Sequence, residues 1–168
     1  MLRRTLLLRH AEAGWGDGSD RERPLTPEGA AAAGRMGRFL ASLDLEPQAV
    51  SSSPAVRART TAELAVEAAG WRKPVQLEES FYGEGSEAVL AHLRRLPEEV
   101  GTVLLVGHEP VWSGLVSGLA GGGRVRFPTA ASACLEADLE KWNELDWGRM
   151  ALCWLVTPEV LRDGGTEV

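Results

Sequence analysis

Two short apolar segments that each end in a histidine constrain the fold of this chain most. Residues 5–8 read Thr-Leu-Leu-Leu and run directly into Arg9 and His10. Residues 103–106 read Val-Leu-Leu-Val, and His108 follows one glycine later. A short apolar run bounded by polar residues is typical of a buried strand in a parallel sheet. Ligands of open α/β sheets bind beyond the carboxyl ends of the strands, so both histidines are predicted to lie at a binding site.

The first two thirds of the chain alternate between strand and helix patterns, which favours a mostly parallel sheet with helices on both faces. Thr26 followed by Pro27 is typical of a helix start, Ser86 is a further candidate capping residue, and Gly70 is a stop signal. The patterns predict strands at 4–8, 49–52, 74–77 and 102–106, and helices at 27–43, 55–69, 86–96 and 111–119.

The pattern changes after three consecutive glycines at 121–123. Residues 133–139 and 148–156 alternate roughly between apolar and polar, and 142–147 reads as the turn between them. This pattern predicts an antiparallel strand pair added at the edge of the sheet. We find no repeat and no linker, so residues 1–162 are expected to form one α/β domain, with 163–168 as a frayed tail.

Composition limits the classes of protein that this chain can belong to. A net charge of -6 argues against a general nucleic-acid binder, because such proteins neutralise phosphates with excess basic residues. The apolar stretch before Arg9 is only four residues long, which argues against a signal peptide, and no apolar run is long enough to cross a membrane. Cys134 and Cys153 are expected to be buried core thiols in a reducing compartment, so we expect a cytoplasmic protein. The sequence does not indicate the number of subunits.

The candidate site is a cationic pocket that suits a phosphoryl group. Arg57 begins the helix that follows the second predicted strand, which places it beside Arg9, His10 and His108. Neutral imidazole is a competent nucleophile for phosphorus, and repulsion from Arg9 and Arg57 is expected to keep His10 unprotonated. Arg9, Arg57 and His108, either protonated or as an N–H donor, would bind the equatorial phosphoryl oxygens. No carboxylate or Cys/His cluster suggests a metal, so no cofactor is expected.

Other residues near these motifs have less certain roles. Glu84, in a loop between two glycines, and Asp20 are the candidate general acids, although each pattern also fits a solvated surface carboxylate. Trp15 lies close to the first motif and could form a pocket wall or pack within its loop. His92 lies inside a predicted helix beside its apolar face, which indicates a structural or surface residue.

Four motifs lie at residues 7–13, 23–29, 53–60 and 106–110. Their sequences and their order resemble the histidine phosphatase superfamily, which has a phosphoglycerate mutase-like fold. The short length and the Arg-Pro-Leu-Thr segment resemble its SixA-type phosphohistidine phosphatases. The resemblance implies a three-layer α/β/α sandwich, with His10 as the phosphorylated nucleophile and Arg9, Arg57 and His108 completing the phosphate pocket. Ala11 replaces the glycine that most of the superfamily carries there, as is common in the SixA-like branch. The absence of Asn from residues 14–18 argues against a phosphoglycerate mutase.

The expected substrate is a phosphohistidine displayed on a protein. The chain between Arg57 and His108 has room for little more than one strand and one helix, so the pocket should be shallow and open. A phosphohistidine can also leave as neutral imidazole and needs less help from a general acid than an alkyl phosphate does. One alternative is a small-molecule phosphomonoesterase that acts on a sugar phosphate or a nucleotide. A non-catalytic phosphate-binding module is the other, although a binder has no need of a nucleophile.

Overall fold

A single mixed sheet of six strands forms the centre of the computed structural model, which describes residues 1–161. The strand order is β3-β2-β4-β1-β5-β6, in which the first four strands are parallel and the last two each run antiparallel to the strand before. The strands are β1 (Leu2–Arg9), β2 (Ala49–Ser52), β3 (Val75–Leu77), β4 (Thr102–Gly107), β5 (Ser132–Asp138) and β6 (Ala151–Val156). The predicted antiparallel edge is therefore confirmed.

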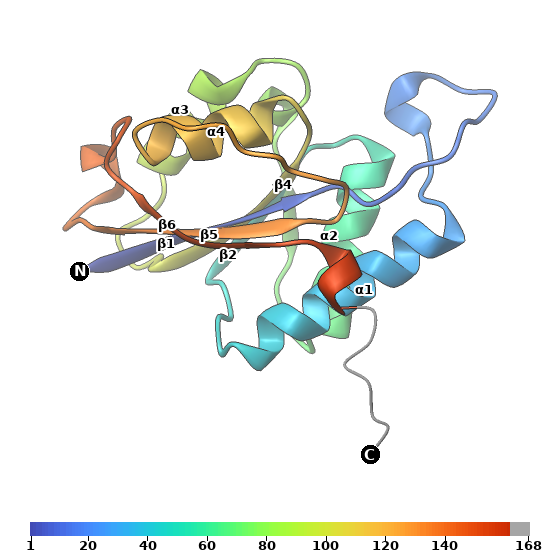
Figure 1. The fold of residues 1–168 in the computed structure, drawn as a ribbon, viewed down its shortest axis with the longest axis horizontal. Helices are drawn as coiled ribbons and strands as arrows, with labels where there is room; N and C mark the ends of the chain where they lie inside the picture. Colours follow the sequence, from blue (N-terminus) through green and yellow to red (C-terminus); the bar gives the residue numbers. More distant parts are fainter. Residues whose placement is uncertain (162–168) are drawn as a thin grey trace.

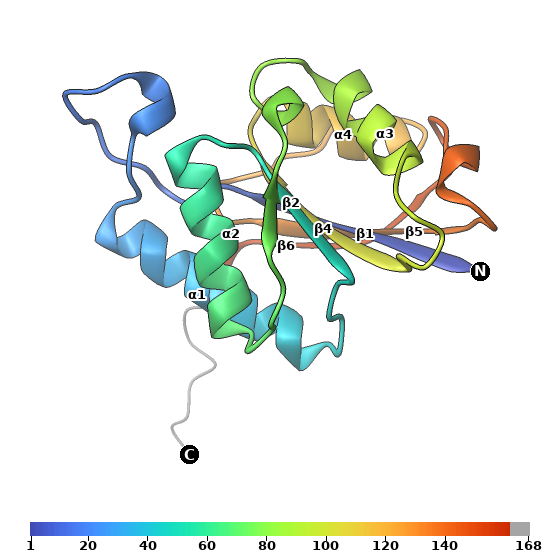
Figure 2. The same cartoon turned by 180° about the vertical axis from the view of Figure 1, so that it is seen from behind.

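Helices cover both faces of this sheet, as Figures 1 and 2 show. One face carries α1 (Pro27–Ser42) and α2 (Val56–Ala68), and the other carries α3 (Ser86–Arg94) and α4 (Val111–Leu119). The chain is thus a single-domain three-layer α/β/α sandwich, as the sequence indicated. Among residues 1–161, no helix is both long and apolar enough to span a bilayer.

The continuous apolar run of β1 is explained by burial on both sides. Leu7 packs in the core cluster under α3 and α4, whereas Leu6 and Leu8 pack in the cluster under α1 and α2. All three leucines are fully buried. Successive side chains of a strand point to opposite faces, so consecutive apolar residues fit the part of a central strand that helices cover on both sides.

The helix starts were predicted with mixed success. Thr26 caps α1 by accepting a hydrogen bond from the Gly29 amide at 3.0 Å, as expected. The expectation that Ser86 caps α3 is wrong. Gly85, with φ of 83°, occupies the cap position, and the Ser86 hydroxyl instead donates to the carbonyl of Val111 at 3.3 Å. The helix also ends at Arg94, two residues earlier than predicted.

The antiparallel edge differs from the prediction in its details. Cys134 is buried as expected, but Cys153 is exposed, so the prediction of two core thiols is wrong for the second one. The register between β5 and β6 shifts between Cys134 and Leu135, and this irregularity disrupts the regular alternation between core and solvent around Cys153. The segment 142–147 contains a short 3-10 helix rather than a simple turn. The tail predicted at 163–168 lies outside the described residues.

Candidate active site

The two central strands deliver both candidate histidines to the same edge of the sheet. β1 and β4 are parallel neighbours whose register pairs Arg9 with Gly107, so His10 and His108 emerge side by side. Their ring centroids lie 5.2 Å apart. Gly107 is required here, because any β-carbon at this position would overlap the ring of Trp112. The strand-end prediction for both histidines is confirmed.

The protonation of His10 follows from its hydrogen bond. Its Nδ1 lies 2.8 Å from the carbonyl oxygen of Ala11. A carbonyl oxygen can only accept, so Nδ1 carries the proton and the lone pair resides on Nε2. The pKa of His10 falls to about 3, chiefly through burial, and charge repulsion from His108, Arg57 and Arg9 adds to the effect. The repulsion expected from the sequence is therefore present, but burial is the larger cause.

His108 is held by a serine that the sequence analysis did not identify as functional. Its Nε2 lies 2.7 Å from Oγ of Ser53, which itself accepts a hydrogen bond from the Ala55 amide at 3.3 Å. Burial, followed by repulsion from Arg57, lowers the pKa of His108 to about 4, so this residue is a neutral N–H donor rather than an imidazolium. When the Ser53 hydroxyl donates to Nε2, the proton resides on Nδ1, which is buried and has no partner among the described residues.

Arg57 lies in the first turn of α2 and is almost fully buried. Its Nη1 donates to the main-chain oxygen of Asp20 at 2.7 Å, and its Nη2 donates to the carboxylate Oδ2 of Asp20 at 3.0 Å. Nε is buried and has no partner among residues 1–161. The guanidinium thus faces the pocket as predicted, but a carboxylate from the loop before α1 engages it.

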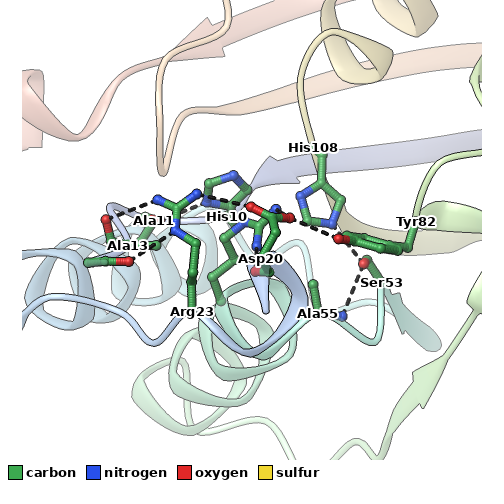
Figure 3. Close-up of polar contacts among 11 residues, drawn as sticks. His10, Ala11, Ala13, Asp20, Arg23, Ser53, Ala55, Tyr82 and His108 are labelled. Atoms are coloured by element: carbon green, nitrogen blue, oxygen red, sulfur yellow. Dashed lines mark hydrogen bonds and ion pairs between the residues drawn. The ribbon is translucent and has the colours of Figure 1, made fainter. Parts of the chain in front are cut away.

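Asp20 is the centre of a network that joins two loops, and Figure 3 shows its contacts. The Tyr82 hydroxyl donates to Oδ2 at 2.8 Å, and Arg23 Nη1 donates to Oδ1 at 3.2 Å. The Tyr82 hydrogen bond, followed by those of Arg57 and Arg23, lowers the pKa of Asp20 to about 2. In this arrangement Asp20 is a stable carboxylate and not a proton donor. Tyr82 was not singled out from the sequence, because nothing local indicates that it faces the pocket.

The site comprises two adjacent hollows that share Glu109. The catalytic pocket has a volume of about 410 Å³ and is lined by His10, Arg57, Phe81, Tyr82, Gly83, Gly85, His108, Glu109, Pro110 and Val111. Arg9 lines the neighbouring hollow, where its Nη1 donates to the carbonyl of Phe127 at 2.9 Å. Its charge still acts on the catalytic pocket, since it lowers the pKa of both His10 and His108.

Three residues considered from the sequence do not line the catalytic pocket. Glu84 is exposed between Gly83 and Gly85, the two glycines that do line it. Trp15 is 89% exposed and forms no pocket wall; the Arg23 guanidinium stacks on its ring, 4.2 Å from the centroid. His92 is buried, and its Nε2 lies 3.1 Å from Oγ of Ser51, which confirms a structural role.

Among residues 1–161, a single group of side chains has the spacing of metal ligands: Cys134, Glu136 and Cys153 on β5 and β6. None of them lines the catalytic pocket. The Glu136 carboxylate is paired with Arg4, and a cation beside the ligands disfavours a metal ion there.

The comparisons with known proteins agree with this geometry. Residues 5–86 match the model of the histidine phosphatase superfamily (branch 1). An uncharacterized protein of Mycobacterium tuberculosis is 33% identical over 163 residues, which cover 90% of this chain and 99% of that protein. The structure of a phosphohistidine phosphatase SixA from Nakamurella multipartitia has 28% identity and a TM-score of 0.82, covering 94% of this chain and 97% of that one.

A second similar structure is that of the protein histidine phosphatase SixA in complex with tungstate. It has 26% identity and a TM-score of 0.84, and the match covers 95% of this chain and 99% of that one. The shared architecture extends over nearly the whole of each chain. The chain therefore belongs to the histidine phosphatase superfamily, among its SixA-type members, and is a phosphatase.

Proposed function

We propose that this phosphatase works without a metal and through a phosphohistidine formed on His10. The observation that carries the proposal is the hydrogen bond from Nδ1 to Ala11, which leaves the Nε2 lone pair of a pocket-lining imidazole available. Nε2 attacks phosphorus while the bond to the leaving group breaks, and water then hydrolyses the N–P bond to release inorganic phosphate. Arg9, Arg57 and neutral His108 bind the phosphoryl oxygens, where charge is spread in the transition state.

We propose phosphohistidine on a protein as the substrate. The pocket supplies few proton donors, because Asp20 is ionised and Glu84 is exposed. An imidazole leaving group can be protonated on its far nitrogen beforehand, so it tolerates a weak general acid. The SixA relatives support the same class of substrate. Glu84 remains the proposed acid for less reactive substrates, because its flanking glycines line the pocket.

We also propose a cytoplasmic location, which subcellular fractionation would test.

Labelling with a rapid quench in alkaline detergent tests the covalent step. The wild-type protein with ³²P-labelled substrate should yield a phosphoprotein that is labile in acid and stable in base, and the label should map to His10. His10→Asn should abolish the label and lower turnover by several powers of ten. The control is His92→Gln, which alters a buried histidine outside the pocket and should keep the label in the folded protein. An acid-stable adduct, or full activity of the His10 variant, would refute the proposal.

Specificity constants test the substrate. We expect kcat/KM for a phosphohistidine peptide to exceed the values for sugar phosphates and nucleotides. A metabolite with the larger value would establish the alternative, a small-molecule phosphomonoesterase that works through the same His10 intermediate. Phosphate binding without turnover of any substrate would instead indicate a non-catalytic module.

A further inference from the structure

A second hollow, with a volume of about 660 Å³, adjoins the catalytic pocket and is lined by three arginines: Arg9, Arg124 and Arg126. Arg9 and Glu109 connect it to the catalytic centre, because the first precedes His10 and the second lines both hollows. We call this hollow the arginine cleft. Two of its arginines have no role in the reaction proposed above.

The alternation of residues 124–127 explains why both arginines reach the cleft. Val125 packs against the core under α3 and α4, and Phe127 is buried in that core. Arg124 and Arg126 occupy the alternate positions and are exposed. Because the two apolar side chains of the segment face the core, the two arginines between and before them are left to line the hollow.

The segment is tied at both ends to elements of the active site. At its start, the Ser117 hydroxyl of α4 donates to the carbonyl of Gly123 at 2.6 Å. At its end, the Phe127 carbonyl accepts the hydrogen bond from Arg9, and the Ala130 amide donates to the carbonyl of His10 at 3.1 Å. In Figure 1 the connection from α4 to β5 runs past the end of β1. The backbone that carries Arg124 and Arg126 is therefore anchored on both sides to elements of the active site.

The charges of the cleft are not neutralised within the described chain. Neither Arg124 nor Arg126 has a hydrogen-bond or ion-pair partner among residues 1–161, although the protein carries a net charge of -6. The one carboxylate that lines the cleft, Glu109, accepts a hydrogen bond from the Ser113 amide at the start of α4. Three guanidinium groups against one carboxylate leave a local positive field that would attract an anion.

We propose that the arginine cleft is a subsite for a second anionic group of the substrate, a phosphate or carboxylate carried on the same molecule as the phosphoryl group that reacts. The inference rests on the proposed function, because Arg9 joins the two hollows. Arginine binds both kinds of oxyanion in a bidentate manner. The second group could belong to a small molecule or to an acidic side chain near the phosphorylated residue of a protein.

Matched substrates and variants test this subsite. Phenyl phosphate offers a single anionic group, whereas the three carboxyphenyl phosphates add a carboxylate at increasing distance. Phosphohistidine peptides with a flanking Glu or a flanking Gln represent a protein substrate with or without an acidic side chain beside the phosphorylated residue. The protein would be compared with Arg124→Gln, Arg126→Gln, the double variant and the control Arg72→Gln. Arg72 is an exposed arginine between α2 and β3, next to the amino end of a parallel strand and thus away from the site.

The double variant should lose about tenfold in kcat/KM on substrates with a second anionic group, as expected for two partly exposed charge pairs. Phenyl phosphate and the Gln-flanked peptide should change by less than about twofold, and Arg72→Gln should change none of them. A loss confined to carboxyphenyl phosphates identifies a small molecule as the source of the anion, and a loss confined to the Glu-flanked peptide identifies a protein. Equal effects on all substrates, or no effect, would overturn the subsite.

Measurements of ligand binding test the arginine cleft independently of the proposed catalytic function. If no substrate is turned over, calorimetry with orthophosphate and tripolyphosphate still tests the cleft. The subsite requires the double variant to weaken tripolyphosphate binding by about tenfold and orthophosphate binding by less than about twofold. Unchanged tripolyphosphate affinity would refute the subsite even where His10 is shown to be phosphorylated.

Discussion

Arg57 and Asp20 form a contact in which the main-chain oxygen and the carboxylate of one residue occupy donors that a phosphoryl group needs. Both terminal nitrogens of Arg57 donate to Asp20, at 2.7 and 3.0 Å. The proposed function assigns the same nitrogens to the phosphoryl oxygens. Tyr82 strengthens the contact from the opposite loop. The substrate therefore competes with Asp20 for the terminal nitrogens of Arg57.

Replacing Asp20 with Asn should tighten phosphate binding. The neutral amide competes less strongly for Arg57 and does not repel the incoming dianion. We expect the competitive inhibition constant of orthophosphate to fall about fivefold, the scale of one partly exposed ion pair. Because the pKa of Asp20 is about 2, the carboxylate stays ionised at any ordinary assay pH, so titration of Asp20 itself should add no pH dependence between pH 5 and 8.

Asp17→Asn is the matched control, because Asp17 is an exposed aspartate in the same loop. It should leave the inhibition constant unchanged. Tyr82→Phe, which removes one hydrogen bond to Asp20, should shift it in the same direction by a smaller factor. Weaker phosphate binding by Asp20→Asn would show that Asp20 orients Arg57 rather than competing for it.

The buried histidines make stability depend on pH. The pKa values of His10 and His108 are lowered to about 3 and about 4 in the folded protein. The unfolded chain therefore binds more protons than the folded one below its histidine pKa of about 6.5. Their stabilising contribution is complete above that pH and is lost as the pH falls, by about 2 kcal/mol for each histidine at pH 5.

Urea unfolding at pH 7 and pH 5 would measure this loss. From pH 7 to pH 5, the free energy of unfolding should decrease less in the double variant His10→Asn/His108→Asn than in the wild type. His92, whose pKa is also lowered by burial, remains in that variant and should leave a residual slope. Identical pH profiles for wild type and variant would contradict the assignment of neutral, buried histidines.

Ser53 should affect catalysis through His108. Ser53→Ala removes the hydroxyl that fixes the Nε2 side of the ring, so we expect kcat to fall about tenfold. His108→Gln should cost about 3 kcal/mol in transition-state stabilisation, as one lost oxyanion donor does. In the double variant the two effects should not add, because both act through the same imidazole. Ser52→Ala, a neighbouring buried serine whose hydroxyl donates to a carbonyl, is the control. Additive losses would show that Ser53 has a separate role.

Exhaustive treatment with EDTA should leave activity intact. The phosphoryl charge would be met by Arg9, Arg57 and His108, and the Asp20 carboxylate is already occupied by two arginines and a tyrosine. Turnover of phenyl phosphate before and after chelation measures the effect. Loss of activity with recovery on adding a divalent ion would overturn the metal-independent mechanism. Repeating the assay with Cys153→Ser would show whether such an effect comes from the cysteine group on β5 and β6.

The residues that were predicted correctly have local signals, and those that were missed depend on contacts between distant segments. An apolar strand that ends on a polar residue is visible in the sequence, which is why His10 and His108 were found. The contact of Asp20 with Arg57 depends on how a long loop folds back over α2, and no local pattern encodes that path. The exposure of Cys153 depends on a shift in strand register that pattern reading cannot detect.

Glu84→Gln tests whether this exposed carboxylate protonates leaving groups. Gly83 and Gly85 have φ of 99° and 83°, a conformation that favours glycine, and both line the pocket on either side of Glu84. If Glu84 is the acid, the variant should slow hydrolysis of an alkyl phosphate by about 100-fold or more, the usual contribution of general acid catalysis. Phosphohistidine peptides and nitrophenyl phosphate should be affected little, because their leaving groups need less protonation.

The control for Glu84→Gln is Glu99→Gln. Glu99 is an exposed glutamate just before the amino end of β4, whereas the site lies beyond the carboxyl end of that strand. It should alter none of the three rates. Equal large losses on all three substrates would show that Glu84 binds substrate instead of donating a proton. No loss on any substrate would make Glu84 a solvated surface residue. The proton would then come from solvent, or from Asp20 once the phosphoryl group has displaced it from Arg57 and its pKa is free to rise.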